Sequence, residues 1–208
     1  MPTTTMKTIA LVTQKGGTGK STLAVHLAVA ARRHGKIVAL IDIDPQGSAR
    51  LWAEKRGRDD VAVVSARAAE LPRLLEEARK QGADFVLIDT AGHMNVSADA
   101  VIQSADVVLI PCRASLYDMA ASAETAAQVQ KAGGKKAAFV LNAVPSRGTR
   151  ADEAREILCE VLPVSPVEIH NLVAFSDALN DGRSVEEFDP HGKAADEIRA
   201  LYDWLMEL

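Results

Sequence analysis

Apolar residues in this chain fall into short continuous runs, separated by longer stretches in which apolar and polar positions recur at helical spacing. The runs have the length of strands and show no polar alternation, which is typical of parallel strands that helices cover on both faces. We expect strands at residues 8–13, 36–41, 60–65, 84–89, 106–111 and 136–141, with a short extended piece at 167–169.

The stretches between these runs predict helices. Their spacing fits residues 23–33, 48–56, 68–81, 97–104, 118–131, 150–161 and 193–207. Strands that alternate with helices pair in parallel through right-handed crossovers. We therefore expect an α/β fold, a doubly wound, mostly parallel sheet flanked by helices, formed as one domain by residues 1–208 with a short flexible arm at 1–6. In such a sheet the ligand binds at the carboxyl ends of the strands.

The segment from Gln14 to Thr22 joins the first predicted strand to the first predicted helix and is rich in glycine. Strand, glycine-rich turn and helix are the context of a phosphate-binding loop. Positive φ is accessible to Gly16, Gly17 and Gly19, and it brings backbone N–H groups close to an anion. The amino end of the following helix also favours a phosphate. A glycine turn without any ligand is the alternative interpretation.

Within this loop Lys20 can reach the β- and γ-phosphates, and the Ser21 hydroxyl can bind Mg²⁺. Lys15 comes directly before two glycines, and Gln14 stands where the general pattern has its first glycine. This form, K-G-G-x-G-K-[ST], resembles the deviant Walker A loop of the ParA/MinD family of ATPases. The resemblance implies a P-loop NTPase that binds ATP and Mg²⁺ through the whole loop, that is through Lys15, Gly16, Gly17, Thr18, Gly19, Lys20, Ser21 and Thr22.

Polar or turn-forming residues also follow the other predicted strands. They are Asp42, Asp44, Asp89, Gly92, Pro111 and Asn142. Because the carboxyl ends of parallel strands share one edge of the sheet, we expect these residues to outline one site. Asp89 follows four apolar residues, as the acid of a Walker B motif does, and is suited to hold Mg²⁺. Capping of a helix is its alternative role.

The acids Asp42 and Asp44 lie in the sequence I-D-I-D-P-Q, which resembles the second acidic motif of the family. Alternate residues of a strand face the same side, so both carboxylates can face the site if the strand continues that far. The resemblance implies that Asp42 helps to hold hydrated Mg²⁺ and that Asp44 orients the water that attacks the γ-phosphate. A simple turn is the alternative.

The resemblance extends to the base of the nucleotide and to a second subunit. Gly92 resembles the switch glycine that meets the γ-phosphate, Asn142 the residue that reads adenine, and Pro190 part of the adenine-side loop. An amide offers the donor and the acceptor that adenine recognition requires, although a turn Asn is an open alternative. Lys15 resembles the signature lysine that crosses to the nucleotide of the partner in an ATP-sandwich homodimer and acts there as an arginine finger does. Lys15, Lys20 and Asp44 are thus the catalytic candidates.

The composition of the chain indicates the class of protein and the cell compartment in which this chemistry takes place. The chain has 208 residues, a formal net charge of −4 and 48% hydrophobic residues, as is ordinary for a soluble globular protein. It contains no signal-peptide core and no apolar run of membrane-spanning length, so we expect a cytoplasmic protein. Cys112 and Cys159 lie far apart without metal-binding spacing, and packing is the role we expect for both.

A ParA-type positioning ATPase, nucleoid-associated in its ATP state, is the function we favour. It needs a basic surface for non-specific DNA, because neutralisation of phosphates supplies the affinity. The candidates are Lys135, Lys136, Arg147, Arg150, Arg155 and Arg183. Each of them could instead be an ordinary solvent-exposed residue without a ligand. Such a protein also needs a ParB-like or other cargo adaptor that stimulates hydrolysis. The sequence leaves the cargo open.

A MinD-like membrane ATPase is the alternative, and it needs a terminal amphipathic helix with basic residues beside its apolar face. The stretch 194–208 is amphipathic but acidic, so we expect it to dock on the domain instead of a membrane. A third hypothesis is a reductase of the nitrogenase-iron-protein type, or a ligase. The two cysteines do not resemble the pattern that a bound cluster requires.

Overall fold

The computed structural model describes residues 6–92, 98–133 and 136–208. The predicted arm except Met6, the first residue of the helix expected at 97–104, and the candidate Lys135 lie outside these ranges. All nucleotide- and metal-site residues predicted from the sequence lie inside them.

One sheet of seven strands forms the centre of the structure. The strands are, in chain order, β1 (Lys7–Leu11), β2 (Val38–Asp42), β3 (Ala62–Ser65), β4 (Phe85–Asp89), β5 (Val107–Cys112), β6 (Lys136–Val144) and β7 (Ile169–His170). They lie in the order β3-β2-β4-β1-β5-β6-β7, and every pair is parallel. The predicted α/β fold is confirmed. Because β1 lies between β4 and β5, the glycine-rich loop leaves the middle of the carboxyl edge.

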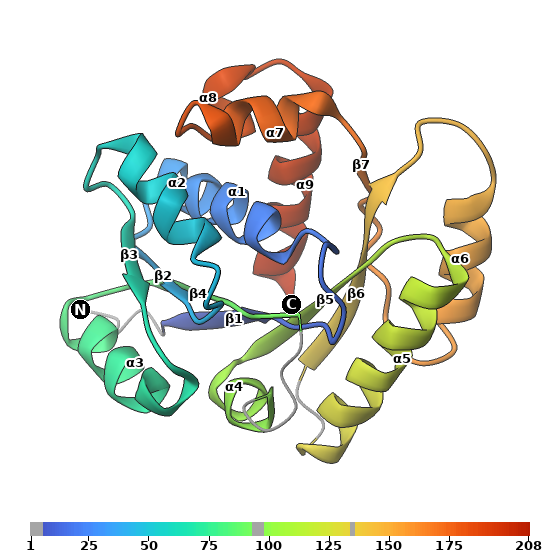
Figure 1. Ribbon diagram of the computed structural model, residues 1–208, viewed down its shortest axis with the longest axis horizontal. Helices are drawn as coiled ribbons and strands as arrows, with labels where there is room; N and C mark the ends of the chain where they lie inside the picture. The colour runs from blue at the N-terminus through green and yellow to red at the C-terminus, as the bar shows by residue number, and fades with distance from the viewer. Residues whose placement is uncertain (1–5, 93–97, 134–135) are drawn as a thin grey trace.

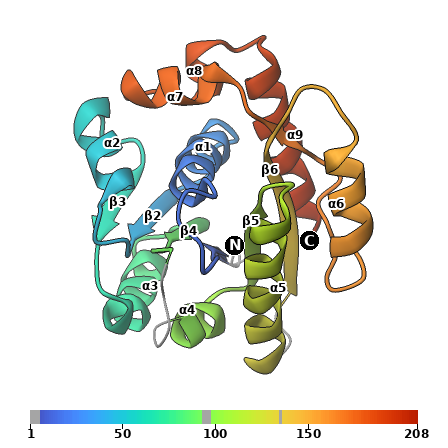
Figure 2. The same ribbon diagram turned by 45° about the vertical axis from the view of Figure 1, so that its right-hand side comes forward.

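Helices cover both faces of this sheet, as Figures 1 and 2 show. One layer consists of α1 (Lys20–Arg33), α2 (Ser48–Arg56), α7 (Val173–Asn180), α8 (Val185–Phe188) and α9 (Lys193–Glu207). The other consists of the 3-10 helix η1 (Ala68–Glu70), α3 (Leu71–Lys80), α4 (Ala98–Ser104), α5 (Leu116–Lys131) and α6 (Arg150–Leu158). Each layer encloses its own cluster of buried apolar side chains.

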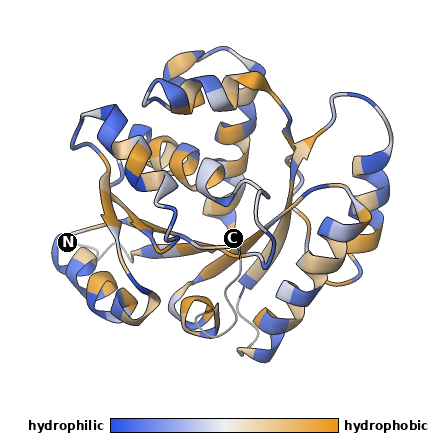
Figure 3. Ribbon diagram, in the orientation of Figure 1, coloured by the Kyte–Doolittle hydropathy of each residue, from blue (hydrophilic) through white to orange (hydrophobic). Residues whose placement is uncertain are grey.

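The strands are apolar throughout because both of their faces are covered. Along β4, for example, Phe85 and Leu87 join the core on the α1 side, whereas Val86 and Ile88 join the core on the α3 side. Figure 3 shows the same contrast, with mostly apolar central strands and helices of mixed polarity. This burial on two faces is the physical reason for the uninterrupted apolar runs in the sequence.

Two helices that the sequence does not predict and the end of one strand are the main differences from the prediction, and several other boundaries shift by one to three residues. The sequence does not predict α7 or α8, because α7 buries only Phe175 and Ala178 and α8 is four residues long. A helix as short as α8 cannot show helical periodicity. β6 continues to Val144, so Asn142 lies inside this strand and not after it.

The C-terminal helix α9 docks on the domain, as predicted. Ile198, Leu201 and Leu205 have no exposed surface. Lys7 Nζ donates to the carbonyl of Leu205 at 2.5 Å, and Lys136 donates to the main-chain oxygen of the final residue, Leu208. Two lysines therefore satisfy carbonyls that the end of a helix leaves unpaired. Among the described residues, no helix is long and apolar enough to cross a membrane.

The two cysteines have different environments. Cys112 ends β5 and is fully buried, and burial raises the pKa of its thiol to about 11, so its predicted packing role is confirmed. Cys159 is exposed, and the packing role predicted for it is wrong. The reason is its position directly after α6, which turns Ala151, Ala154 and Leu158 inward and leaves the next residue outside.

Candidate functional site

The loop between β1 and α1 has the backbone path of a phosphate-binding loop. Gly17 and Gly19 have φ angles of 74° and 91°, which lie in the left-handed region that side chains disfavour. Gly16 does not have a positive φ, so the expectation for that glycine is wrong. Gly19 is the N-cap of α1. The free N–H groups and the dipole of this helix end therefore face the loop and favour an anion.

Residues from β6 and from the end of β4, which lie on opposite sides of β1, contact the loop. A Cβ added to Gly92, which follows β4, would lie 2.6 Å from the backbone nitrogen of Gly16. A Cβ added to Gly19 would overlap the side-chain amide of Asn142, which comes from β6. Glycine at positions 19 and 92 thus lets the loop backbone lie in direct contact with its neighbours.

Asn142 holds the loop through a side-chain hydrogen bond to its backbone. Its Nδ2 donates to the carbonyl of Thr18 at 2.6 Å in a buried hydrogen bond. The next residue, Ala143, has a φ of 53°, and the pairing of β6 with β7 shifts register there. Such bulges re-aim side chains. The contact between Asn142 and adenine stays a prediction, as does that of Pro190, which is exposed after α8.

The two lysines of the loop have different surroundings. Lys20 is only 5% exposed, and its Nζ donates to the carbonyl of Lys15 at 3.3 Å. Burial lowers the pKa of Lys20, and the carboxylates of Asp89 and Asp44 oppose that shift. The Lys15 side chain is 41% exposed, and its Nζ lies 2.9 Å from Oδ1 of Asp118 in the first turn of α5. The sequence does not predict this ion pair, which draws Lys15 toward α5.

Asp118 is itself fixed in place. Its backbone N–H donates to Ser115 Oγ, the N-cap of α5, and the Ser115 hydroxyl donates to the carboxylate. Burial acts to raise the pKa of Asp118, but the hydrogen bonds from Ser115 and Lys15 outweigh it and hold this pKa below its ordinary value. The carboxylate is therefore ionised at neutral pH and attracts Lys15.

Asp42, the last residue of β2, caps the following helix. Its Oδ2 accepts hydrogen bonds from the N–H groups of Ala49 (3.1 Å) and Arg50 (3.2 Å), and its Oδ1 accepts one from the N–H of Asp44 (3.1 Å). Burial raises the pKa of Asp42, and these three bonds oppose that shift. The capping role considered for Asp89 is thus found at Asp42, whose predicted contact with hydrated Mg²⁺ stays a prediction.

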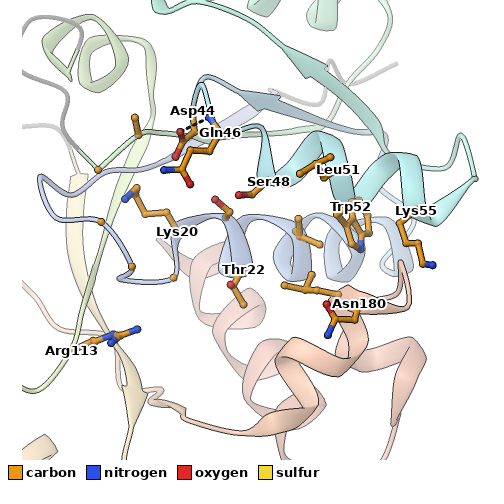
Figure 4. A pocket seen from close by; sticks show the side chains of 18 residues that line it. Lys20, Thr22, Asp44, Gln46, Ser48, Leu51, Trp52, Lys55, Arg113 and Asn180 are labelled. Carbon is orange, nitrogen blue, oxygen red and sulfur yellow. Dashed lines mark hydrogen bonds between the residues drawn. The ribbon is translucent and has the colours of Figure 1, made fainter.

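The chain turns sharply after Asp42. The N–H of Gly47 donates to the carbonyl of Asp44 at 2.9 Å, and Oδ1 of Asp44 accepts from the N–H of Gln46 at 2.9 Å. The turn interpretation is therefore correct for the backbone, and the strand ends too early for alternation to align the two acids. Asp44 still lines the same cavity as Lys20, as Figure 4 shows, because the turn carries it there.

Asp89, the last residue of β4, is the most unusual charged group of the site. It is fully buried, and neither carboxylate oxygen has a hydrogen-bond partner in the part of the chain that the structure describes. Burial raises the pKa of Asp89 to about 7; Asp42 and Asp44 add to this shift, whereas Ser21 and Lys20 oppose it. A divalent cation next to these oxygens would remove the cost of the buried charge.

The donor set around Asp89 fits Mg²⁺ bound together with a nucleotide. Across the described ranges, no three His, Cys, Asp or Glu side chains cluster as an all-protein metal site. Mg²⁺ is commonly held by one or two protein oxygens together with phosphate oxygens and water. Asp89 and the Ser21 hydroxyl can supply the protein oxygens, and the adjacent loop can hold the phosphates.

A cavity of about 870 Å³ opens over the loop. Of the predicted residues, it is lined by Gly16, Gly17, Gly19, Lys20, Ser21, Thr22, Asp44 and Gly92. Its wall does not include the predicted residues Lys15, Thr18, Asp42, Asp89, Pro111, Asn142 and Pro190. Pro111 lies inside β5 and not beyond its end. The sequence analysis missed several lining residues, among them Gln46, Trp52, Lys55, Arg113 and Asn180 (Figure 4).

Two of these omissions had a signal in the sequence, since Gln46 belongs to the I-D-I-D-P-Q motif and Arg113 stands at a strand end. Arg113 directly follows β5, so the rule that picked out Asp42 and Asp89 at strand ends could have found it. Trp52 and Lys55 come from α2, and Asn180 ends α7. Their approach to the loop depends on how the helices pack, which local sequence does not reveal.

Three of the candidate DNA-binding residues that the structure describes are engaged in contacts within the chain. Lys136 contacts the C-terminus, Arg155 pairs with Glu168 at 3.0 Å, and Arg183 pairs with Asp181. Arg147 and Arg150 remain exposed, and no ion-pair partner lies within 4.0 Å of either among the described residues. These two arginines flank the start of α6.

Known proteins resemble this chain in sequence and in fold. Residues 9–185 match the family model described as the CobQ/CobB/MinD/ParA nucleotide binding domain. The maintenance of carboxysome distribution protein A of Gloeobacter kilaueensis is 34% identical over 200 residues, which cover 94% of this chain and 90% of that protein. The chromosome-partitioning ATPase Soj of Thermus thermophilus is 30% identical over 141 residues, or 54% of this chain and 57% of Soj. The structure of the septum site-determining protein MinD of Pyrococcus horikoshii, complexed with Mg-ADP, matches with a TM-score of 0.78 over 96% of both chains at 18% identity, which shows the shared fold.

The close contacts of the loop predict how its glycines tolerate alanine. Gly19→Ala should lower the stability of the nucleotide-free protein by more than about 1 kcal/mol, because it adds a side chain at positive φ and against Asn142. Gly92→Ala should also destabilise it. Gly16→Ala is the matched control, since a Cβ there meets nothing within 4 Å. Thermal unfolding of the three variants measures this, and an equal loss of stability in all three would contradict the proposed packing.

The raised pKa of Asp89 predicts a dependence of stability on pH. Folding raises this pKa from 3.8 to about 7, so Asp89 lowers the stability of the metal-free protein as the pH rises across that interval. Asp89→Asn cannot ionise and should raise the melting temperature more at pH 8 than at pH 5, in the presence of a chelator. An equal rise in melting temperature at both pH values would show that the carboxyl group of Asp89 is not forced to ionise in a buried position.

Proposed function

Because the chain belongs to the CobQ/CobB/MinD/ParA family of nucleotide-binding domains, we propose that it is a ParA-type ATPase that positions a cellular cargo. In this proposal the single domain binds ATP with Mg²⁺, pairs with a second copy, binds DNA non-specifically in the ATP state, and releases DNA after hydrolysis. The observation that carries the proposal is the combination of a phosphate-binding loop with Lys15 at its start, 41% exposed and paired with an ionised acid.

Binding of the nucleotide rests on the loop. Backbone N–H groups from Gly16 to Thr22 face the phosphates, Lys20 adds a nearly buried positive charge, and Ser21 with Asp89 would hold the metal. Mg²⁺, when bound, neutralises charge that develops on the phosphate oxygens. The turn at Asp44 brings a carboxylate to the same cavity. There it orients the water that attacks the γ-phosphate, as the resemblance implies.

Lys15 supports the proposed link between ATP and pairing of two subunits. In a single chain its charge is compensated by Asp118 at 2.9 Å, a contact of a partly exposed pair that contributes little free energy. The phosphates of a nucleotide in a facing subunit would offer a stronger partner for the ammonium group. We propose that Lys15 leaves Asp118 for those phosphates when two ATP-bound chains meet.

The proposed output is positioning of a cargo on the nucleoid within the cytoplasm. A relative acts in carboxysome distribution and another in chromosome partitioning, and both names support a positioning role. A ParB-like or other cargo adaptor would stimulate hydrolysis. The packing of α9 supports this choice over a MinD-like membrane ATPase, because the apolar face of that helix is occupied by the core.

Replacement of the signature lysine tests the dimer. Lys15→Gln should abolish formation of dimers in ATP and leave binding of ATP to the single chain within a few-fold of the original. Lys131→Gln, an exposed lysine at the far end of α5, is the matched control. Light scattering after gel filtration gives the molar mass in ATP and in ADP. A Lys15→Gln protein that dimerises normally would refute the sandwich arrangement.

A second prediction concerns DNA. Asp44→Ala should bind ATP without turning it over and should shift DNA fragments of any sequence in ATP but not in ADP.

Arg147→Ala and Arg150→Ala should each remove one cation that neutralises a DNA phosphate. Each substitution should reduce the slope of log K against log salt concentration by about 1. Arg32→Ala, an exposed arginine at the opposite edge of the sheet, should change nothing. Equal DNA binding in ATP and ADP would exclude the proposed switch.

A further inference from the structure

The most connected charged side chain outside the cavity is Arg56, the last residue of α2. Its side chain is 1% exposed, and its guanidinium makes two hydrogen bonds to Asp60, both of 2.7 Å. It makes two more to Glu187 on α8, of 2.7 and 2.8 Å, and one to the carbonyl of Gly182 at 3.2 Å. All five N–H donors of an arginine are thereby used. The sequence analysis assigned no role to this residue.

Of the two carboxylates, only Glu187 links α2 to a distant part of the chain. Asp60 lies four residues beyond Arg56, whereas Glu187 lies on α8 and also accepts from the backbone N–H of Ser184 at 3.0 Å, which closes a capping box. Nearby, a Cβ on Gly182 would lie 2.7 Å from the backbone nitrogen of Arg56, so the two backbones are in direct contact. The Trp52 indole adds a hydrogen bond of 3.2 Å to the carbonyl of Arg183.

The helix α8 is tied to α1 as well. The N–H of Val185 donates to Nδ1 of His26, a fully buried residue in the middle of α1, at 3.3 Å. Burial lowers the pKa of His26 to about 3, so the ring is neutral and Nδ1 accepts at physiological pH. The ring also meets the edge of Phe175 from α7, with 5.3 Å between centroids. α8 therefore connects the two helices that begin at the cavity.

Both of those helices carry chemistry at their first turn. α1 begins with Lys20 and Ser21, and α2 begins directly after the turn that holds Asp44. The carboxylate of Asp42 fixes the first turn of α2 to β2. Toward its other end, α2 packs against the core through Trp52 and is joined to α8 and the segment before it by the hydrogen bonds of Trp52 and Arg56. Figures 1 and 2 show α2 beside α1, with α7 and α8 next to this pair.

We propose that Arg56 is a positioning residue for ATP hydrolysis: its ion pair with Glu187 holds α2, and with it Asp44, in a fixed place relative to the phosphate loop. The inference rests on the proposed ATPase function. A group that orients an attacking water must be held within about 0.5 Å, and a misplacement of about 1 Å can cost about 100-fold in rate. Anchors at both ends of α2 restrict its movement more than the anchor at its first turn does alone.

The two partners of Arg56 provide a matched pair of variants. Glu187→Gln removes the link to α8 but keeps an acceptor for the capping box, and Arg56 stays compensated by Asp60. Asp60→Asn removes a carboxylate with equally short hydrogen bonds and leaves the link to α8 intact. Arg56→Lys keeps the charge and loses the planar fork that engages both acids, and it serves if Glu187→Gln folds poorly.

The first measurement is ATP hydrolysis together with binding of ATP. Glu187→Gln and Arg56→Lys should lower kcat by about tenfold or more, and the Kd for ATP should stay within about threefold because the loop is untouched. Asp60→Asn should keep the original kcat. The inference is overturned if Glu187→Gln and Asp60→Asn lose kcat in equal measure, or if neither does. A wild-type protein without any ATP hydrolysis would instead refute the proposed function.

The second measurement needs neither nucleotide nor turnover. Trp52 lies beside Arg56, with 5.0 Å from the guanidinium carbon to the ring centroid, and is 4% exposed. In a Trp204→Phe background it is the only tryptophan left. Acrylamide should quench its fluorescence more strongly in Glu187→Gln than in the parent, and equally in Asp60→Asn and the parent. Equal quenching in all three would show that the ion pair does not hold α2, whatever the hydrolysis assay gives.

Discussion

The structure depends on the contact of the phosphate loop with backbone and amide groups from the strands on either side. Gly92 brings the end of β4 to the backbone of Gly16, and Asn142 brings β6 to Gly19 and to the carbonyl of Thr18. These contacts leave no room for a side chain at positions 19 and 92. They hold the loop in shape before any ligand arrives, so the protein does not have to order it on binding.

This arrangement places charges where they are costly without a ligand. Lys20 and Asp89 are nearly or fully buried, and the oxygens of Asp89 have no hydrogen-bond partner among the described residues. Burial shifts the pKa of each toward its neutral form, down for Lys20 and up for Asp89. A nucleotide with Mg²⁺ would supply the missing opposite charges. We infer that the unfavourable free energy of these buried charges in the empty protein is relieved on binding, which favours the bound state.

The order of strands and helices could be predicted because it follows from apolar runs and their spacing, as at Phe85–Asp89. The residues at strand ends could be predicted for the same reason, since parallel strands bring their carboxyl ends together. Other features depend on packing between distant segments. The pairing of Lys15 with Asp118, the cap that Asp42 provides and the bond of Arg56 to Glu187 join residues that no local pattern connects. The bulge at Ala143 likewise has no signature in the sequence.

The central claim is that this chain binds nucleotide phosphates with a preformed loop and a magnesium ion. Isothermal titration of the nucleotide-free protein with ATP, ADP and AMP, each with Mg²⁺ and with a chelator, tests it most directly. We expect one site per chain for ATP and ADP, weaker binding without Mg²⁺, and no measurable binding of AMP, which lacks the β-phosphate that Lys20 is proposed to contact. Binding of AMP as tight as that of ATP, or no binding of any of the three, would contradict it.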